Sequence, residues 1–225
     1  MRDPQGTGTG ALTLPEELLL LALDPVRGRP ISNPKFLRYG LAGATLADLE
    51  AAGRIQCERG DRISVTNPLP TGDPVLDGAL AALPDPGKNR GARVKAHRWV
   101  RTAARPMQEL CLRRLEERGA VRREARRALG LFPYARFPVG SVDLTGPARA
   151  RFRSAIDAGL PDRRSCLLAA HASATDLDTK LLPGSSFRSR RRDLKRLAQQ
   201  EWTAKAAHHA VQMDKSAAST AGGAT

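Results

Sequence analysis

A chain of 225 residues, of which 41% are hydrophobic, can bury a sizeable core, which excludes wholesale disorder. Its 37 Lys and Arg residues outnumber the 23 Asp and Glu residues, and the formal net charge is +14. Such a polycation favours polyanionic partners, either nucleic acid or an anionic membrane.

The three cysteines, Cys57, Cys111 and Cys166, lie far apart in the sequence and form no paired CxxC motifs. This spacing indicates neither a zinc ribbon nor a disulfide framework, so a reduced, cytoplasmic protein fits best. The leucine-rich run over residues 18–23 is too short to span a bilayer. It follows two glutamates instead of a basic segment, so it is not expected to be a signal peptide either.

The N-terminal residues 1–11 are rich in Gly and Thr, and we expect them to be flexible. A helix is predicted from Thr13, because Thr13 and Glu16 have the spacing of a capping box and a proline is tolerated in the first turn. Pro25 ends this helix. Its leucines leave little polar surface, which predicts a helix buried on most sides.

A second helical stretch over residues 33–52 ends at Gly53, because glycine takes the left-handed conformation at low cost. Residues 54–66 then alternate about a turn at residues 59–61, which predicts a β-hairpin. The expected inward positions are Ile55, Cys57, Ile63 and Val65.

The second half of the chain is predicted to be helical as well, with a short helix over about 74–83 and a long helix over about 94–118. Residues 121–139 are compatible with another hairpin or with a longer loop. The remaining predicted helices are residues 146–160, residues 161–182 and a basic helix over 186–211.

These elements predict a mainly α protein, with a single compact helical domain and one or two β-hairpins. The expected organisation is a flexible segment at 1–11, a helical domain at 12–203 and a low-complexity tail at 204–225.

Six phrases, taken in order, resemble the Golgi phosphoprotein three family of peripheral membrane proteins, which bind phosphatidylinositol 4-phosphate. The phrases cover about residues 12–200 and read TLPEELLLLALD, GLAGATLADLEAAGRI, PTGDPVLDGAL, RRLEERGAV, LFPYARFP and LLAAHAS. The resemblance implies a single helical domain without catalytic activity or a cofactor. It also implies a protruding β-hairpin between Leu131 and Val139 that mediates self-association.

The lipid pocket of that family uses an aromatic residue, an arginine in the GL-x-G stretch and two basic residues three positions apart. The matching positions here are Asn33, Ala42, Arg105 and Gln108, and Arg105 alone keeps the chemistry of the family. We therefore interpret the chain as a divergent, bacterial member of the family with a shifted pocket.

Arg105 is the expected principal contact for a lipid phosphate, because phosphate recognition needs several cationic donors that converge on one point. Arg98 and Arg101 share one helical face with it, and Lys35 and Arg38 precede the GL-x-G stretch. These five residues form the predicted headgroup site, and no metal ligands are predicted. The alternative is that the arginine face is simply solvated.

Other basic and aromatic positions have two interpretations each. The densest basic cluster could hold an anionic surface, could hold nucleic acid, or could be a solvated helix face. It consists of Arg188, Arg190, Arg191, Arg192, Lys195 and Arg196. Trp99 and Phe36 are candidates for an aromatic residue at the lipid interface, although a core position is favoured for both. His171 is interpreted as a core histidine rather than as a catalytic base.

The predicted function is that of a non-enzymatic, cytoplasmic protein that associates peripherally with membranes and binds phosphoinositide or other anionic lipid headgroups. The expected partners are anionic lipids and a second copy of the chain, bound through the hairpin. The alternative is a nucleic-acid-binding protein built from winged-helix-like units. Nucleic acid ranks lower, because the helix that would read DNA carries Asp48 and Glu50 and no basic residue in its GL-x-G half. An enzyme ranks third, since no phosphate loop, metal cluster or triad spacing is present.

Overall fold

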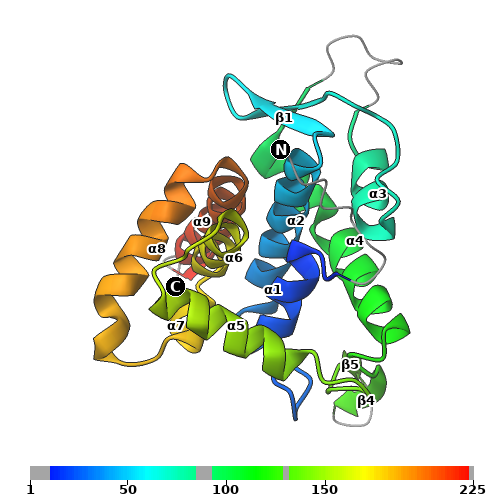
Figure 1. Cartoon of the computed structure of the whole chain (residues 1–225), viewed down its shortest axis with the longest axis vertical. Coiled ribbons are helices and arrows are strands. Elements are labelled where there is room, and N and C mark those ends of the chain that lie inside the picture. The colour runs from blue at the N-terminus through cyan, green and yellow to red at the C-terminus, as the bar shows by residue number, and fades with distance from the viewer. Residues whose placement is uncertain (1–10, 85–92, 129–131, 223–225) are drawn as a thin grey trace, which may run out of the picture.

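The computed structural model describes residues 11–84, 93–128 and 132–222, and it confirms a mainly helical fold with two small antiparallel sheets (Figure 1). The elements in chain order are α1 (Leu14–Ala22), α2 (Pro34–Ala51), β1 (Ile55–Glu58), β2 (Arg62–Val65), α3 (Pro74–Ala81), β3 (Val94–Lys95), α4 (Ala96–Glu117), β4 (Glu124–Ala128), β5 (Phe132–Arg136), α5 (Thr145–Asp157), α6 (Arg163–Ala174), α7 (Asp178–Leu181), a 3-10 turn (Ser185–Phe187), α8 (Arg188–Gln200) and α9 (Trp202–Gly222).

Helix α1 begins with the predicted capping box. The backbone N–H of Thr13 donates to the Glu16 carboxylate at 2.7 Å, and the Thr13 hydroxyl accepts from the backbone N–H of Glu16 at 3.4 Å. These bonds satisfy amide groups that would otherwise have no partner at the start of the helix. Every residue of α1 is buried, so the prediction of a helix covered on most sides is confirmed.

Helix α2 lies at the centre of the molecule, where it packs against α1, α3, α4, α6 and α9 (Figure 1). Glycine makes a close approach of α2 to α6 and α9 possible. A Cβ atom at Gly43 would lie 2.9 Å from the His171 ring and 2.9 Å from the carbonyl oxygen of Thr203. His171 is fully buried, with its Nε2 atom 3.2 Å from the Thr203 hydroxyl, so the core interpretation of this histidine is confirmed.

The first hairpin follows α2 as predicted. Gly53 takes a left-handed conformation with φ 66°, and the N–H of Arg54 donates back to the carbonyl of Leu49, which closes the helix end. Strands β1 and β2 pair antiparallel with Cys57 opposite Ile63, and β3 pairs with β2 to complete a three-stranded sheet. Two of the predicted inward positions, Ile55 and Ile63, are buried, and the other two are half-buried.

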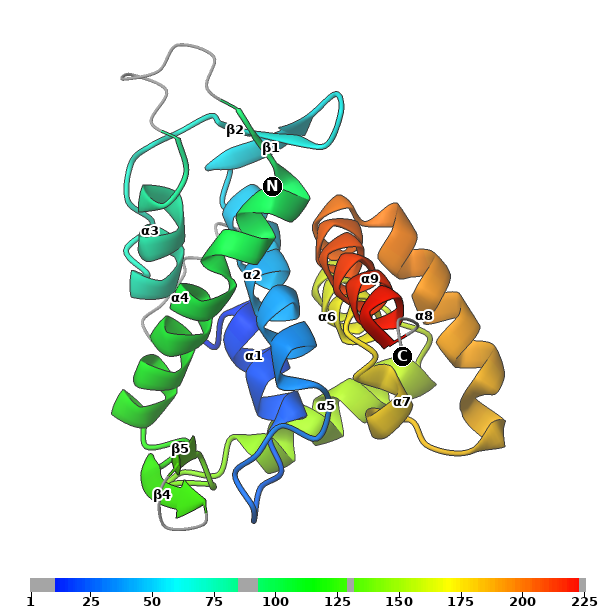
Figure 2. The same cartoon turned by 180° about the vertical axis from the view of Figure 1, so that it is seen from behind.

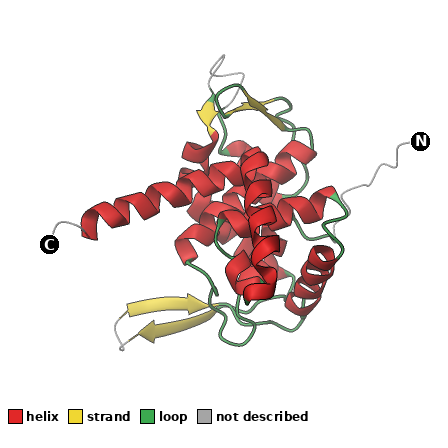
Figure 3. Ribbon diagram, turned by 90° about the vertical axis from the view of Figure 1, so that its left-hand side faces the viewer, coloured by secondary structure: helices red, strands yellow, loops and turns green. Residues whose placement is uncertain are grey.

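Strands β4 and β5 form a second hairpin, which settles the choice between a hairpin and a longer loop. Ala125 pairs with Ala135 near the middle of its register. The hairpin projects from the helical body (Figure 3). The expected range of 131–139 begins at Leu131, which lies outside the described residues.

The last third of the chain differs from the prediction at two breaks. The predicted helix over 161–182 divides into α6 and α7, since Asp176 between them has a left-handed φ of 59°. The predicted basic helix divides into α8 and α9 at Glu201, which is extended and forms an ion pair with Arg163 of α6.

Helix α9 runs from Trp202 to Gly222 and so includes most of the residues that we expected to form a low-complexity tail. Its small side chains let it pack closely against α2, and Ala204, Ala207 and Val211 are fully buried. The expected boundary between residues 203 and 204 therefore falls inside a core helix. The expected flexible segment, apart from Ala11, lies outside the described residues.

Candidate anion-binding site

Two cationic side chains from neighbouring helices converge on one carboxylate. Helices α2 and α4 lie side by side (Figures 1 and 2). Lys35 near the start of α2 places its Nζ atom 2.7 Å from Oδ2 of Asp214, a residue of α9. Arg101 of α4 places a guanidinium nitrogen 3.7 Å from the other oxygen, Oδ1. The Tyr39 hydroxyl donates to Oδ2 at 2.8 Å.

These contacts fix the charge states of the group. Burial pushes the pKa of Asp214 upward, but hydrogen bonds from Lys35 and Tyr39 outweigh it and hold that pKa below the ordinary value. The hydrogen bond to Asp214 raises the pKa of Lys35, and burial raises the pKa of Tyr39. Near neutral pH the group therefore consists of two cations, one carboxylate and one neutral phenol.

A second contact joins the same two helices. Arg38 is half-buried, and its Nε atom donates to the side-chain oxygen of Gln108 at 2.8 Å. Gln108 and Arg105 lie three residues apart on α4 and are neighbours on its surface. The guanidinium of Arg38 thus lies beside the position at which the family pattern expects a second basic residue.

Arg98 and Arg105 are both exposed, and within the described part of the chain neither forms an ion pair or a side-chain hydrogen bond. They lie on the same face of α4 as Arg101, at three- and four-residue spacing. Their five-donor guanidinium groups are therefore open to an external anion.

Two positions of the family pattern cannot serve as expected. Asn33 caps α2, where its side chain accepts from the N–H of Lys35 at 2.9 Å. Ala42 is fully buried within α2, so an arginine there could not reach an external ligand without displacing the core. Of the five predicted headgroup residues, Lys35 and Arg101 are brought together through their contacts with Asp214.

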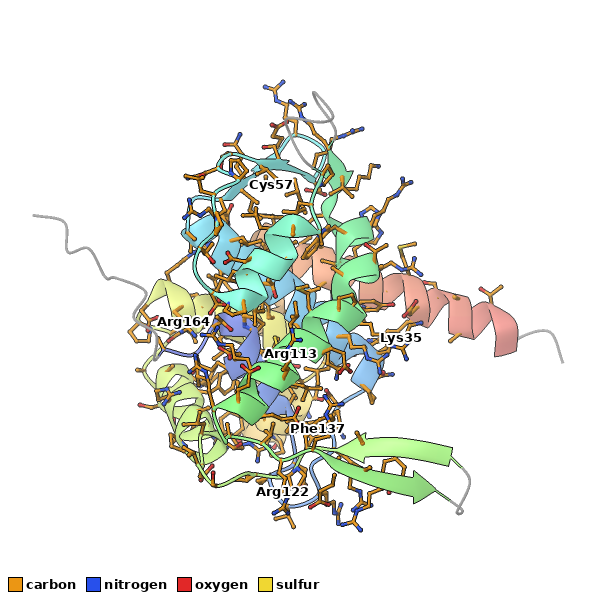
Figure 4. All side chains as sticks on the ribbon, turned by 90° about the vertical axis from the view of Figure 1, so that its right-hand side faces the viewer. Lys35, Cys57, Arg113, Arg122, Phe137 and Arg164 are labelled. Atoms are coloured by element: carbon orange, nitrogen blue, oxygen red, sulfur yellow. The ribbon has the colours of Figure 1, made fainter. Side chains whose placement is uncertain are left out.

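The site faces the side of the molecule from which two elements project. The β4–β5 hairpin and the C-terminal end of α9 extend from the same side of the helical body (Figures 3 and 4). Lys35 lies on that side, between the two (Figure 4).

Asp214 and Tyr39 are the residues of this group that the sequence did not indicate.

Both aromatic candidates are explained by packing. Trp99 is buried with its indole N–H donating to the carbonyl of Ala82, so its core interpretation is confirmed. Phe36 is half-buried and lies under the ammonium of Lys215, with 5.4 Å from Nζ to the ring centroid.

The basic cluster on α8 is only partly available. Arg190 and Arg191 donate to backbone carbonyls at Ile156 and Leu182, and Arg196 pairs with Asp193. Arg188 and Arg192 are exposed, without an ion pair in the part of the chain that the structure describes. These two exposed arginines can therefore serve as a control for Arg98 and Arg105 of α4 in binding experiments.

The winged-helix alternative fails on the helix that suggested it. Helix α2 is covered by five other helices and cannot enter a DNA groove. Its two acidic residues form hydrogen bonds within the protein: Asp48 accepts from the backbone N–H of Leu14, and Glu50 accepts from the indole N–H of Trp202.

Comparison with protein families decides the relationship. The family model for Golgi phosphoprotein 3 (GPP34) matches residues 14–213. The chain belongs to this family. Among curated proteins no sequence matches it. The Golgi phosphoprotein 3 family consists of peripheral Golgi proteins that bind phosphatidylinositol 4-phosphate, and it is non-catalytic in general.

Two kinds of feature are absent from the described residues. Among the described residues, no helix combines the length and apolar character that a bilayer crossing requires. No group of three His, Cys, Asp or Glu side chains within the same residues is arranged to hold a metal ion.

Proposed function

We propose that this protein is a non-enzymatic, peripheral membrane protein that binds phosphoinositide or other anionic lipid headgroups between α2 and α4. The observation that supports this most is the convergence of Lys35 and Arg101 on one carboxylate, because it places cations from two helices around a single point. Arg105 is the principal phosphate contact in this proposal, assisted by Arg98. Arg38 supplies the positive charge that Gln108 lacks at the second basic position of the family pattern.

The exposed arginines of α4 suit a phosphate ligand. Guanidinium groups match phosphate oxygens in geometry, and each basic residue near an anionic membrane contributes about 1 kcal/mol to binding. Arg98 and Arg105 are free to make such contacts. The hairpin and the end of α9 extend on the side of the molecule on which Lys35 lies (Figure 4).

The test is co-sedimentation with neutral, phosphatidylglycerol and phosphatidylinositol 4-phosphate vesicles, at low and at physiological salt. The Arg98→Ala, Arg105→Ala double variant should lose about 2 kcal/mol of binding free energy, or about thirtyfold in affinity, for the phosphoinositide vesicles. The matched control is the Arg188→Ala, Arg192→Ala double variant, which removes two exposed arginines from α8 and should bind as the wild type does.

Equal losses in both double variants would mean that the whole positive charge drives binding, and the proposed site would be wrong. Loss in the α8 variant alone would move the binding surface to α8. Absence of binding to any anionic vesicle would refute the lipid function itself, and nucleic acid would then be the next polyanion to test.

Self-association and location remain part of the proposal. The paired residues Ala125 and Ala135 are exposed on the projecting hairpin, and a second copy could cover them. An Ala125→Glu variant should then sediment as a smaller species than the wild type. Unchanged sedimentation would argue against the hairpin contact.

In cell fractions the protein should divide between cytoplasm and membrane and should leave the membrane at high salt.

A further inference from the structure

In the Asp214 carboxylate at the centre of the basic group, one oxygen atom accepts two hydrogen bonds and the other accepts none from the described residues. Oδ2 of Asp214 accepts two hydrogen bonds, one from Lys35 at 2.7 Å and one from the Tyr39 hydroxyl at 2.8 Å. Oδ1 receives no hydrogen bond from the described part of the chain, since Arg101 lies 3.7 Å away. The side chain keeps 12% of its surface exposed.

This arrangement is unexpected in a site that binds phosphate alone. A carboxylate repels a phosphate and cancels part of the charge of the lysine and arginine beside it. A carboxylate oxygen with open lone pairs does, however, accept a hydrogen bond from a hydroxyl, and such charge-assisted bonds are among the stronger ones in proteins.

We infer that Asp214 is a specificity-determining residue of the headgroup site: while the lipid phosphate binds Arg101 and Arg105, a hydroxyl beside that phosphate donates to Oδ1 of Asp214. The inference rests on the proposed headgroup site and deepens it by naming the residue that distinguishes headgroups with such a hydroxyl from those without one. A phosphate group without a hydroxyl beside it meets the repulsion of the carboxylate and gains nothing in return.

Preorganisation supports this role. The two bonds to Oδ2 fix the carboxylate before a ligand arrives, so little ordering cost remains for the hydroxyl that binds it. The neighbouring residue Lys215 anchors the same turn of α9 through an ion pair with Asp176 at 2.6 Å and through its contact with Phe36. Residues 216–220 beyond this turn are exposed, so Asp214 and Lys215 are the last anchored positions of α9 within the described range.

The test compares two lipids that both carry a phosphate monoester. Phosphatidylinositol 4-phosphate has hydroxyls next to its monoester phosphate, and phosphatidic acid has none. Wild-type protein should bind vesicles with phosphatidylinositol 4-phosphate more tightly than vesicles with phosphatidic acid at equal mole fraction. In the Asp214→Asn variant this affinity ratio should fall by about tenfold, which corresponds to the loss of one hydrogen bond to a charged acceptor.

The Asn side chain retains an oxygen that accepts from Tyr39, and thermal unfolding verifies that the variant folds. Asp193→Asn is the matched control, because it removes the same charge from the exposed face of α8 and should leave the ratio unchanged. A second variant, Tyr39→Phe, removes one of the two bonds that hold the carboxylate and should lower the ratio by a smaller factor.

The outcomes separate the inference from the proposed function. If neither vesicle binds above the neutral background, the proposed function fails. If both bind and depend on Arg105 but the ratio is the same in wild type and Asp214→Asn, the inference fails. An equal gain for both lipids in Asp214→Asn would also overturn it, because Asp214 would then act only as an internal competitor. Calorimetry with soluble inositol 1,4-bisphosphate tests the other source of the same chemistry. Binding as tight as to vesicles would assign the site to a free polyol phosphate, and much weaker binding would assign it to the membrane lipid.

Discussion

Asp48 offers a direct test of how burial controls the stability of this fold. Its carboxylate lies on α2 with 16% of its surface exposed and accepts from the N–H of Leu14, the first residue of α1, at 2.6 Å. Burial raises the pKa of Asp48 from an ordinary value of 3.8 to about 6, although the bond from Leu14 and the charge of Arg164 act against it. At about 1.4 kcal/mol per pKa unit, the ionised form costs the folded state about 3 kcal/mol.

The sign follows from which state holds the proton more tightly. Because the folded pKa lies above the unfolded one, the stabilising effect of the proton is fully present below pH 3.8 and is lost as the pH rises through 6. An Asp48→Asn variant keeps an oxygen for the Leu14 N–H and carries no charge. It should be more stable than the wild type by about 3 kcal/mol at pH 8, and the difference should shrink below about 1 kcal/mol at pH 4.

The assay is urea unfolding followed by circular dichroism at pH 4, 6 and 8. Asp193→Asn serves as the control, since Asp193 is exposed and its replacement should shift stability little at any of these pH values. The reasoning would be refuted if wild type and Asp48→Asn differed by the same amount at all three pH values, or if the variant were the less stable protein at pH 8.

Three further predictions concern the interior. Burial lowers the pKa of His171 from 6.5 to about 3, so between these pH values the unfolded chain alone takes up the proton, and stability should fall by about 1.4 kcal/mol per pH unit as the pH falls from 6.5 towards 3. A His171→Gln variant should lose that slope, measured by urea unfolding at pH 7 and pH 5. Gly43→Ala should destabilise the fold by about 1–3 kcal/mol in the same assay at pH 7, because the added carbon meets the His171 ring and a backbone oxygen at 2.9 Å. Arg114→Ala should cost about 3 kcal/mol, since the fully buried Glu16 carboxylate, 3.1 Å from the Arg114 Nε atom, would lose this ion pair.

Each of these has an outcome that contradicts it. An unchanged acid slope in His171→Gln would show that other groups control acid unfolding. Unaltered stability of Gly43→Ala would mean that α2 and α9 can move apart at no cost. If Glu16→Gln failed to recover stability in the Arg114→Ala background, the loss would come from packing and not from the lost ion pair with Glu16.

Local sequence signals predicted the first half of the fold well. The capping box at Thr13, the left-handed stop at Gly53 and the hairpin that follows all depend on residues within a few positions of one another. Such short-range signals are present in the sequence itself, so these elements and their inward faces could be predicted from it.

The C-terminal region could not be predicted in the same way. The stretch after Trp202 is rich in Ala, Ser and Thr and has few large apolar side chains, so its composition is typical of a solvated tail. Its burial depends on Gly43, because a Cβ atom there would lie 3.2 Å from the Cβ of Ala207. Small residues on α9 therefore match a small residue on α2, and this match exists only in three dimensions.

The candidate site shows the same division. Lys35 and Arg101, which the structure brings together at Asp214, could be singled out as candidates, because basic residues at helical spacing near a recognisable motif are visible in the sequence. Asp214 could not, since it belongs to a helix that seemed by composition to be a tail, and it reaches the other members only through tertiary packing. The burial of Ala42 could not be predicted either, because it depends on the helices that cover α2.

The position of α9 also has a consequence for biosynthesis. Ala42 and Leu46 of α2 share a core cluster with Ala207 and Val211 of α9, although α2 leaves the ribosome long before α9 is made. Until then the face of α2 that packs against α9 lacks that helix and is open to aggregation or to chaperones. Asp214 belongs to the same helix, so a chain that ends before α9 lacks both its complete core and the carboxylate that Lys35 and Arg101 contact.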